Sequence, residues 1–224
     1  MRRASVVTVV RRPASAAVAG LFFAIILSAA MLLMRSAASG SLADSGRWID
    51  DATRREAVSL AMGLVPFAGI AFLWFIAVAR TLLGSREDRF FETVFLGSGL
   101  LFVGTLFVAG AELTTALTLD DAAVLPASAA SQSWVFAATL LGTFGTRMAA
   151  VFALAISTAG LHGANMPRWL GLVGYATGLL LLLTPPLPLL TQLVFPIWVA
   201  IVSATLLRSR SRTATTLEPT GDET

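Results

Sequence analysis

The sequence predicts an all-α polytopic transmembrane helix bundle. Six long apolar runs fill most of the 224 residues, of which 56% are hydrophobic and only 13% are charged. Soluble domains carry about 25% charged residues. About 20 apolar residues are needed to cross the roughly 30 Å of hydrocarbon in a bilayer. Six such runs leave room for short loops and none for a second domain.

The six expected spans are 16–34, 58–83, 90–117, 134–160, 169–184 and 187–207. They predict an N-terminal tail (1–15), a transmembrane domain (16–207) and a disordered C-terminal tail (208–224). The segment Thr184-Pro185-Pro186-Leu187-Pro188 cannot continue a helix. Five spans are therefore possible if the last two runs are one broken helix.

The arginines predict the orientation of these spans. Eleven lie on the two tails and on the turns after the second and fourth runs, whereas Arg35, Arg47, Arg54 and Arg55 lie in the first loop. Positive charge stays in the cytoplasm, so both termini are expected there. The basic residues are all arginine, which is typical of a GC-rich bacterial genome and predicts a bacterial cytoplasmic membrane.

Two short polar motifs predict where helices begin. Thr53-Arg54-Arg55-Glu56 has the spacing of a capping box, and so does Ser85-Arg86-Glu87-Asp88 directly after Gly84. The second and third helices are therefore expected to form a tight antiparallel hairpin. Within the third helix, Glu92 is expected to pair with Arg89 at the i,i+3 spacing.

Several absences exclude classes of chemistry. The chain has no cysteine, no lysine and a single histidine, His162, so disulfides, a Schiff-base lysine and multi-histidine metal sites are excluded. No cofactor or metal is expected. The pI is near 10.9, but the net charge is only +3 and the arginines are dispersed, which argues against nucleic acid as a partner.

Two charged residues fall inside the predicted spans. Arg147 lies near the middle of the fourth run, where a charge costs about 2.5–3.5 kcal/mol on insertion scales. Glu112 in the third run is the expected partner. The run boundaries put the two about 13 Å apart in depth at the usual helical rise. A direct pair therefore needs tilt, a shifted boundary or a bridging water.

A polar row is expected beside these charges. Ser98, Thr105 and Glu112 are seven residues apart, and a row of small residues (Gly97, Gly104, Ala111) has the same spacing. Both rows should share one face of the third helix, and Thr139, Thr146 and Ala153 form a similar row on the fourth. This face is interpreted either as helix packing anchored by Arg147, or as a substrate or ion path lined by Arg147, Glu112, Thr105 and Ser98.

A third interpretation is catalytic. Ser98 lies between two glycines, as does the serine of intramembrane proteases. However, residue 96 is Leu rather than Gly, and His162 lies at the cytoplasmic end of the fourth run. Few other titratable groups could converge on one site, so no enzyme is expected.

One stretch carries a resemblance. It includes Phe72-Leu73-Trp74-Phe75-Ile76, Arg80 and the segment from Arg86 to Leu101. Over 72–107 the chain resembles small multi-pass membrane proteins of actinobacteria, a group with no assigned activity. The resemblance implies a source and a topology but no mechanism.

The function expected from the sequence is a non-catalytic accessory or partner-binding helix bundle. Its expected partners are the lipid bilayer and either another membrane protein or a second copy of the chain. The alternative is a small transporter or channel with a polar site around Arg147 and Glu112.

Overall fold

The described part of the chain is all helical. The computed structural model describes residues 12–38, 45–80, 89–124, 126, 128–162, 167–183 and 193–215. In chain order the main elements are α1 (Arg12–Ala37), α2 (Ala52–Ala79), α3 (Arg89–Asp121), α4 (Ala129–Thr139), η2 (Leu140–Gly145), α5 (Thr146–His162), α6 (Arg168–Leu183) and α7 (Val194–Thr215). The predicted all-α class is therefore confirmed for these residues.

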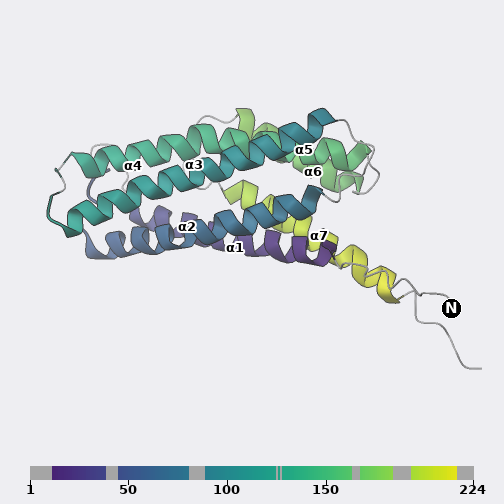
Figure 1. Cartoon of the computed structure of the whole chain (residues 1–224), viewed down its shortest axis with the longest axis horizontal. Helices are drawn as coiled ribbons and strands as arrows, with labels where there is room; N and C mark the ends of the chain where they lie inside the picture. Colours follow the sequence, from purple (N-terminus) through teal and green to yellow (C-terminus); the bar gives the residue numbers. More distant parts are fainter. Residues whose placement is uncertain are drawn as a thin grey trace, which may run out of the picture.

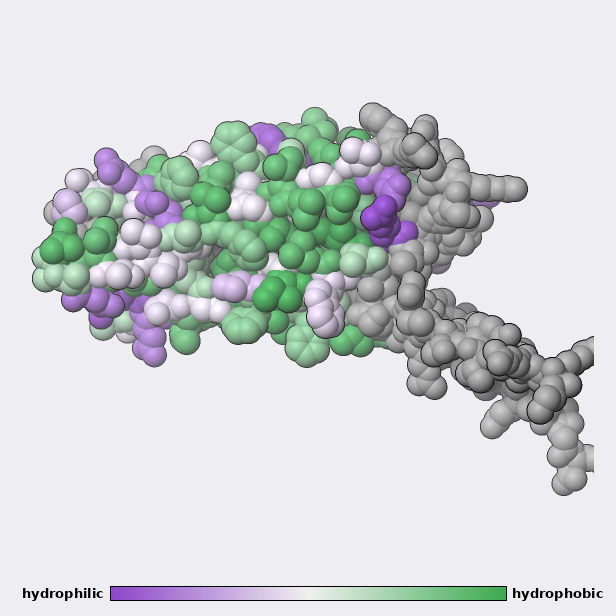
Figure 2. Space-filling view, in the orientation of Figure 1, coloured by the Kyte–Doolittle hydropathy of each residue, from purple (hydrophilic) through white to green (hydrophobic). Residues whose placement is uncertain are grey.

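Four helical segments are long and apolar enough to cross a membrane. They are Ala17–Ala37, Ala52–Ala77, Glu92–Asp121 and the continuous stretch Ala129–Leu161 formed by α4, η2 and α5. The described starts of α1 and α3 and the end of α7 lie at the same end of an elongated bundle (Figure 1). Apolar residues cover much of the middle of one face, and hydrophilic residues gather toward its two ends (Figure 2).

The last two helices are shorter. The apolar parts are Arg168–Leu183 in α6 and Val194–Arg208 in α7. Glycines of α6 fix its register against α5, because a Cβ at Gly171 would meet Leu161 and one at Gly178 would meet Leu154. In this antiparallel register, α6 ends level with about Ala149. Figure 1 accordingly shows α6 and α7 beside only the half of the bundle that holds α5.

An aromatic cluster fills the centre of the bundle. Phe72 of α2 has neighbouring rings from four other helices, with its centroid 4.5 Å from that of Phe23 and 5.0 Å from that of Phe152. The cluster consists of Phe23, Phe72, Phe75, Phe95, Phe102, Phe152, Phe195 and Trp198. Tilted and edge-to-face rings at such spacing stabilise beyond their buried area. These contacts join α1, α2, α3, α5 and α7 into one core.

Some predicted helix boundaries differ from the structure. The N-terminus of α2 is capped by Asp51, whose Oδ1 accepts hydrogen bonds from the backbone N–H groups of Thr53 (2.9 Å) and Arg54 (3.1 Å). The capping box assigned to Thr53 was therefore wrong, because an aspartate two residues earlier meets the same free N–H groups. At the other end of the chain, α7 stays helical to Thr215, beyond the predicted end of the sixth run at 207.

Three predicted features lie outside the described residues. They are the hairpin turn at 84–88, the proline-rich break at 184–188 and the chain ends at 1–11 and 216–224. Glu92 pairs with Arg80, the residue directly after α2, whereas the sequence predicts Arg89 as its partner. This ion pair joins α2 to α3 at the end of the bundle where their predicted hairpin lies.

Candidate functional site

The helix that carries Arg147 contains a π-helical turn. Residues Leu140–Gly145 form η2 between α4 and α5. The backbone N–H and the Oγ1 of Thr146 both donate to the carbonyl oxygen of Leu141, five residues earlier. A π turn adds one residue to the helix and often marks a functional position. The hydropathy pattern does not predict this turn, and Gly142 and Gly145 are its only local signal in the sequence.

Arg147 follows this turn directly. Its Nη1 donates to the carbonyl oxygen of Thr143 at 2.8 Å, and the side chain is half-buried. Among the ion pairs of the described residues, none includes Arg147. The guanidinium therefore uses one of its five N–H donors on its own helix.

Glu112 is held elsewhere. Its Oε1 accepts a hydrogen bond of 2.7 Å from Ser133 Oγ near the start of α4. Ser133 precedes Arg147 by fourteen residues, which is about 21 Å along the helix at 1.5 Å per residue. The structure therefore does not bring Glu112 and Arg147 together. Ser133 is not predicted as the partner of Glu112, because the sequence determines neither the rotation of each helix about its axis nor the level of its residues along the bundle.

The two rows of α3 face different ways. Ser98 is buried, Thr105 and Glu112 are half-buried, and Gly104 and Ala111 are exposed. The hydroxyls of the inner row bond to their own helix: Ser98 Oγ donates to Val94 O at 2.7 Å, and Thr105 Oγ1 donates to Phe102 O at 2.7 Å. A Cβ at Gly104 would have nothing within 4 Å. The small row is therefore an outward face, contrary to the predicted shared interface.

The contact between α3 and the helix of Arg147 is close. A Cβ placed on Gly145 would lie 2.9 Å from Thr105 Oγ1. The expected partner row on the fourth helix is broken, since Thr139 is exposed while Ala153 is fully buried. The extra residue of η2 explains this, because it rotates α4 relative to α5 and a spacing of seven no longer returns to one face.

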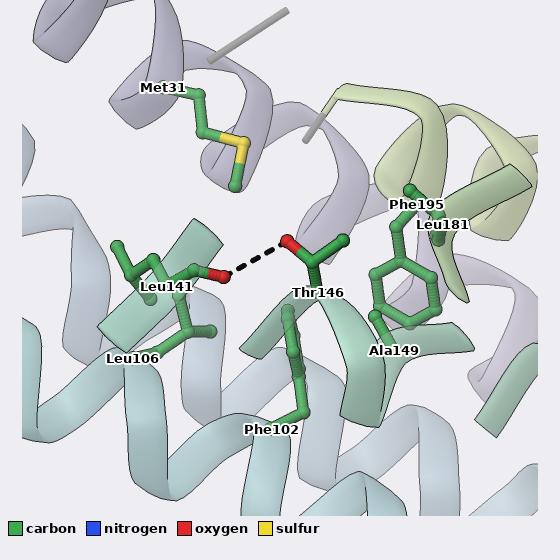
Figure 3. A pocket seen from close by; sticks show the side chains of 8 residues that line it. All are labelled: Met31, Phe102, Leu106, Leu141, Thr146, Ala149, Leu181 and Phe195. Carbon is green, nitrogen blue, oxygen red and sulfur yellow. Dashed lines mark hydrogen bonds between the residues drawn. The ribbon is translucent and has the colours of Figure 1, made fainter. Parts of the chain in front are cut away.

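A small pocket lies behind this contact. Its volume is about 10 Å³, and its lining is almost entirely apolar: Met31, Phe102, Leu106, Leu141, Thr146, Ala149, Leu181 and Phe195. Figure 3 shows the Thr146 hydroxyl turned to Leu141 O across it. A water needs about this much room and two to four polar partners. The pocket therefore suits a packing defect between helices better than a polar path.

The segment between α1 and α2, which includes Trp48, packs against the end of the bundle near the start of α4. Trp48 is buried, its Nε1 donates to Ala130 O at 3.3 Å, and its ring lies 6.0 Å from that of Trp134. Beside it, Arg55 Nη1 contacts Asp120 Oδ2 at 2.8 Å. These contacts tie the loop and the start of α2 to α3 and α4.

At two helix crossings, the helices approach so closely that only glycine fits. A Cβ on Gly174 of α6 would overlap Ser157 Oγ, and one on Gly20 of α1 would overlap Ser203 Oγ of α7. Trp198 Nε1 and Ser203 Oγ are buried without a hydrogen-bond partner. Small residues that let helices approach closely are the usual means of packing within a membrane.

The described residues thus form a packed bundle of apolar helices, compatible with an integral membrane protein. They hold no group of three or more His, Asp or Glu residues that could bind a metal ion. No protein family, curated protein or solved structure matches the chain.

Proposed function

We propose that this chain is a non-catalytic accessory protein of a membrane, which acts by binding a membrane partner. The observation that carries the proposal is the close-packed contact of α3 with the Arg147 helix. The hydroxyls along it bond to their own helices, and Gly145 lies directly against Thr105. An accessory role needs a stable scaffold with an outward docking face, and this packing supplies the scaffold.

A crosslinking experiment in the native membrane tests this proposal. Exposed phenylalanines lie on four different elements: Phe22, Phe67, Phe136 and Phe144. Each is replaced by the photoreactive benzoylphenylalanine, which keeps an aromatic side chain. A specific partner predicts an adduct of one discrete mass from one or two neighbouring positions. Lipid adducts alone from all four positions would contradict the accessory role.

A small transporter or channel is the second candidate. Two observations favour it: the π turn next to Arg147 and the short apolar parts of α6 and α7. Interrupted helices are common at transport sites, and π turns are common at functional ones. Arg147→Leu discriminates between the candidates. If the variant folds normally but loses uptake or efflux, the accessory role is contradicted. If its thermal stability in detergent falls sharply, Arg147 stabilises the helix packing.

We also propose a topology and a location. The arginine distribution supports cytoplasmic termini in a bacterial plasma membrane, the source that the resemblance to actinobacterial membrane proteins also implies. The register of α6 on α5 supports four full spans, with the short apolar parts of α6 and α7 entering and leaving the bilayer at one end. This proposal differs from the six spans expected from the sequence, and it keeps both termini on one side.

A further inference from the structure

Arg147 lies close to the middle of the longest continuous helix. Seventeen residues of α4 and η2 and Thr146 of α5 precede it, and fifteen residues of α5 follow it. At 1.5 Å per residue the whole helix is about 50 Å long, and Arg147 is about 22 Å from the end at His162. If the roughly 30 Å hydrocarbon layer is centred on this helix, the Arg147 backbone is about 12 Å inside it. That depth exceeds the reach of an arginine side chain to the headgroups.

The chain itself supplies no carboxylate at this depth among its described residues. Glu112 is bonded to Ser133, about 21 Å away along the helix. Glu92 is paired with Arg80 at the end of the bundle. A parallel second copy would present the same two carboxylates at the same two depths. Self-association therefore cannot neutralise Arg147 with these groups.

The surface around Arg147 lies beyond the end of the helix that packs on α5. Glycines of α6 lie against Leu154, Ser157 and Leu161 of α5. Further toward α4, Arg147 and Thr143 are half-buried, and Thr139 and Phe136 are exposed. We call these four residues the α4 face. Since α6 ends level with about Ala149, it leaves this face uncovered, and Phe136 is 48% exposed.

We propose that the α4 face binds a transmembrane helix of a different protein, and that this helix carries an Asp or Glu at mid-depth that pairs with Arg147. The inference rests on the accessory role proposed above and names the chemistry of the partner. Ionisable groups inside a bilayer pair with one another, and an arginine–carboxylate pair can form two parallel hydrogen bonds. Thr139 and Thr143 are small enough to let the partner backbone approach.

A set of synthetic single-span helices can test the proposed pairing of Arg147 with a carboxylate even though the partner protein is not identified. The purified full chain, labelled at a cysteine introduced at Thr224, is reconstituted in phosphatidylcholine liposomes. Resonance energy transfer is measured from this label to each of four labelled leucine-rich helices. Three of the helices carry Glu, Gln or Leu at the centre, and the fourth carries Glu two turns from the centre. We expect the central Glu helix to bind roughly five- to thirtyfold more tightly than the Leu helix, the range for polar contacts between membrane helices.

Variants of the chain assign the preference to Arg147. Arg147→Leu should remove the preference for central Glu, and Arg147→Lys should keep part of it because the charge remains. Arg168→Leu is the matched control, since Arg168 is exposed at the start of α6 and should leave the preference unchanged. The comparison among the four helices on the unaltered chain does not depend on any variant folding.

Two results would overturn the inference. One is equal binding of the Glu, Gln and Leu helices, or a preference that survives Arg147→Leu. The other is displacement of the Glu helix by a few per cent of phosphatidylglycerol, with that lipid retained by the unaltered chain and lost from Arg147→Leu in native mass spectrometry. The second result would make Arg147 a lipid site. Either failure leaves the accessory role to be judged by the crosslinking series, which does not involve Arg147.

Discussion

At the scale of single residues, the glycines separate into two kinds. Gly174 is pressed between α5 and α7, so that a Cβ there would overlap Ser157 Oγ and lie 3.1 Å from Trp198 Nε1. Gly104 faces outward with nothing within 4 Å of such a Cβ. The sequence alone does not distinguish them, because both are glycines within apolar runs. Only the rotation of each helix in the bundle decides which glycine is needed for packing.

Alanine substitution at these two positions gives the first prediction. Gly174→Ala should lower the free energy of unfolding by about 1–3 kcal/mol, the usual cost of overpacking a close contact. Gly104→Ala should be neutral or stabilise by up to about 1 kcal/mol, since alanine is the better helix former. Denaturation in detergent, followed by circular dichroism, measures both. Equal effects of the two substitutions would mean that α5 and α6 do not cross as described.

The Glu112–Ser133 hydrogen bond gives a second prediction. Glu112→Gln, Ser133→Ala and the double variant form a cycle, in which we expect a coupling energy of about 0.5–2 kcal/mol, as for other hydrogen bonds within membranes. A parallel cycle of Glu112→Gln with Arg147→Leu is the control and should give additive changes, because the two side chains are far apart. Strong coupling in the control cycle would restore the direct pair that the sequence suggested.

At the scale of elements, η2 sets the relative rotation of the two helix segments it joins. On its α4 side, Ser133 reaches Glu112; on its α5 side, Phe152 and Ala153 enter the core. Deleting Gly142 should convert the turn to regular α-helix and rotate one side by about 100°. One of the two sets of contacts would then be lost.

We expect this deletion to cost about 3 kcal/mol or more of unfolding free energy, because an entire set of buried contacts is displaced. Deletion of Ala122, which lies in the turn after α3, is the control and should cost far less. A chain that tolerates the Gly142 deletion as well as the Ala122 deletion would show that the π turn does not determine the register of α4.

The depth of α6 gives a prediction about topology. Leu183, at the end of α6, is 76% exposed on the bundle surface. The register on α5 puts it level with about Ala149, which is at mid-depth in the proposed topology. Leu183→Cys should therefore resist a membrane-impermeant maleimide applied to either side of intact vesicles. Arg168→Cys, at the start of α6, should react from the cytoplasmic side. Labelling of Leu183→Cys from the opposite side would support six full spans.

The sequence predicts where helices lie far better than it predicts the rotation of each helix about its own axis. The apolar runs located the helices because the bilayer requires long apolar segments whatever the neighbours are. The rows on α3 and α4–α5 were assigned from spacing alone, which assumes regular helices and a known rotation. The π turn violates the first assumption, and the outward direction of Gly104 violates the second. Partners such as Ser133 for Glu112 depend on both and could not be obtained from the sequence.

At the scale of the whole molecule, the chain is a core of aromatic rings surrounded by apolar helices, with polar contacts concentrated toward the ends. Trp48, Arg55 and Asp120 tie one end together, and Arg80 and Glu92 tie the other. Between them, the described inner hydroxyls are satisfied mostly by their own helices. These contacts indicate that the middle region is dry packing, and the proposed partner site therefore lies on the outer face.

Cysteine accessibility tests that claim most directly, since the chain has no native cysteine to remove. Single cysteines are placed at Ser98, Thr105 and Thr146 in the middle region, and at Gln132 and Arg168 as exposed controls. The reconstituted variants are treated with a water-soluble methanethiosulfonate reagent. We predict that the two controls react and the three interior positions do not. Rapid reaction at Thr105 and Thr146 would reveal a water-filled path beside Arg147 and would contradict dry packing of the middle region.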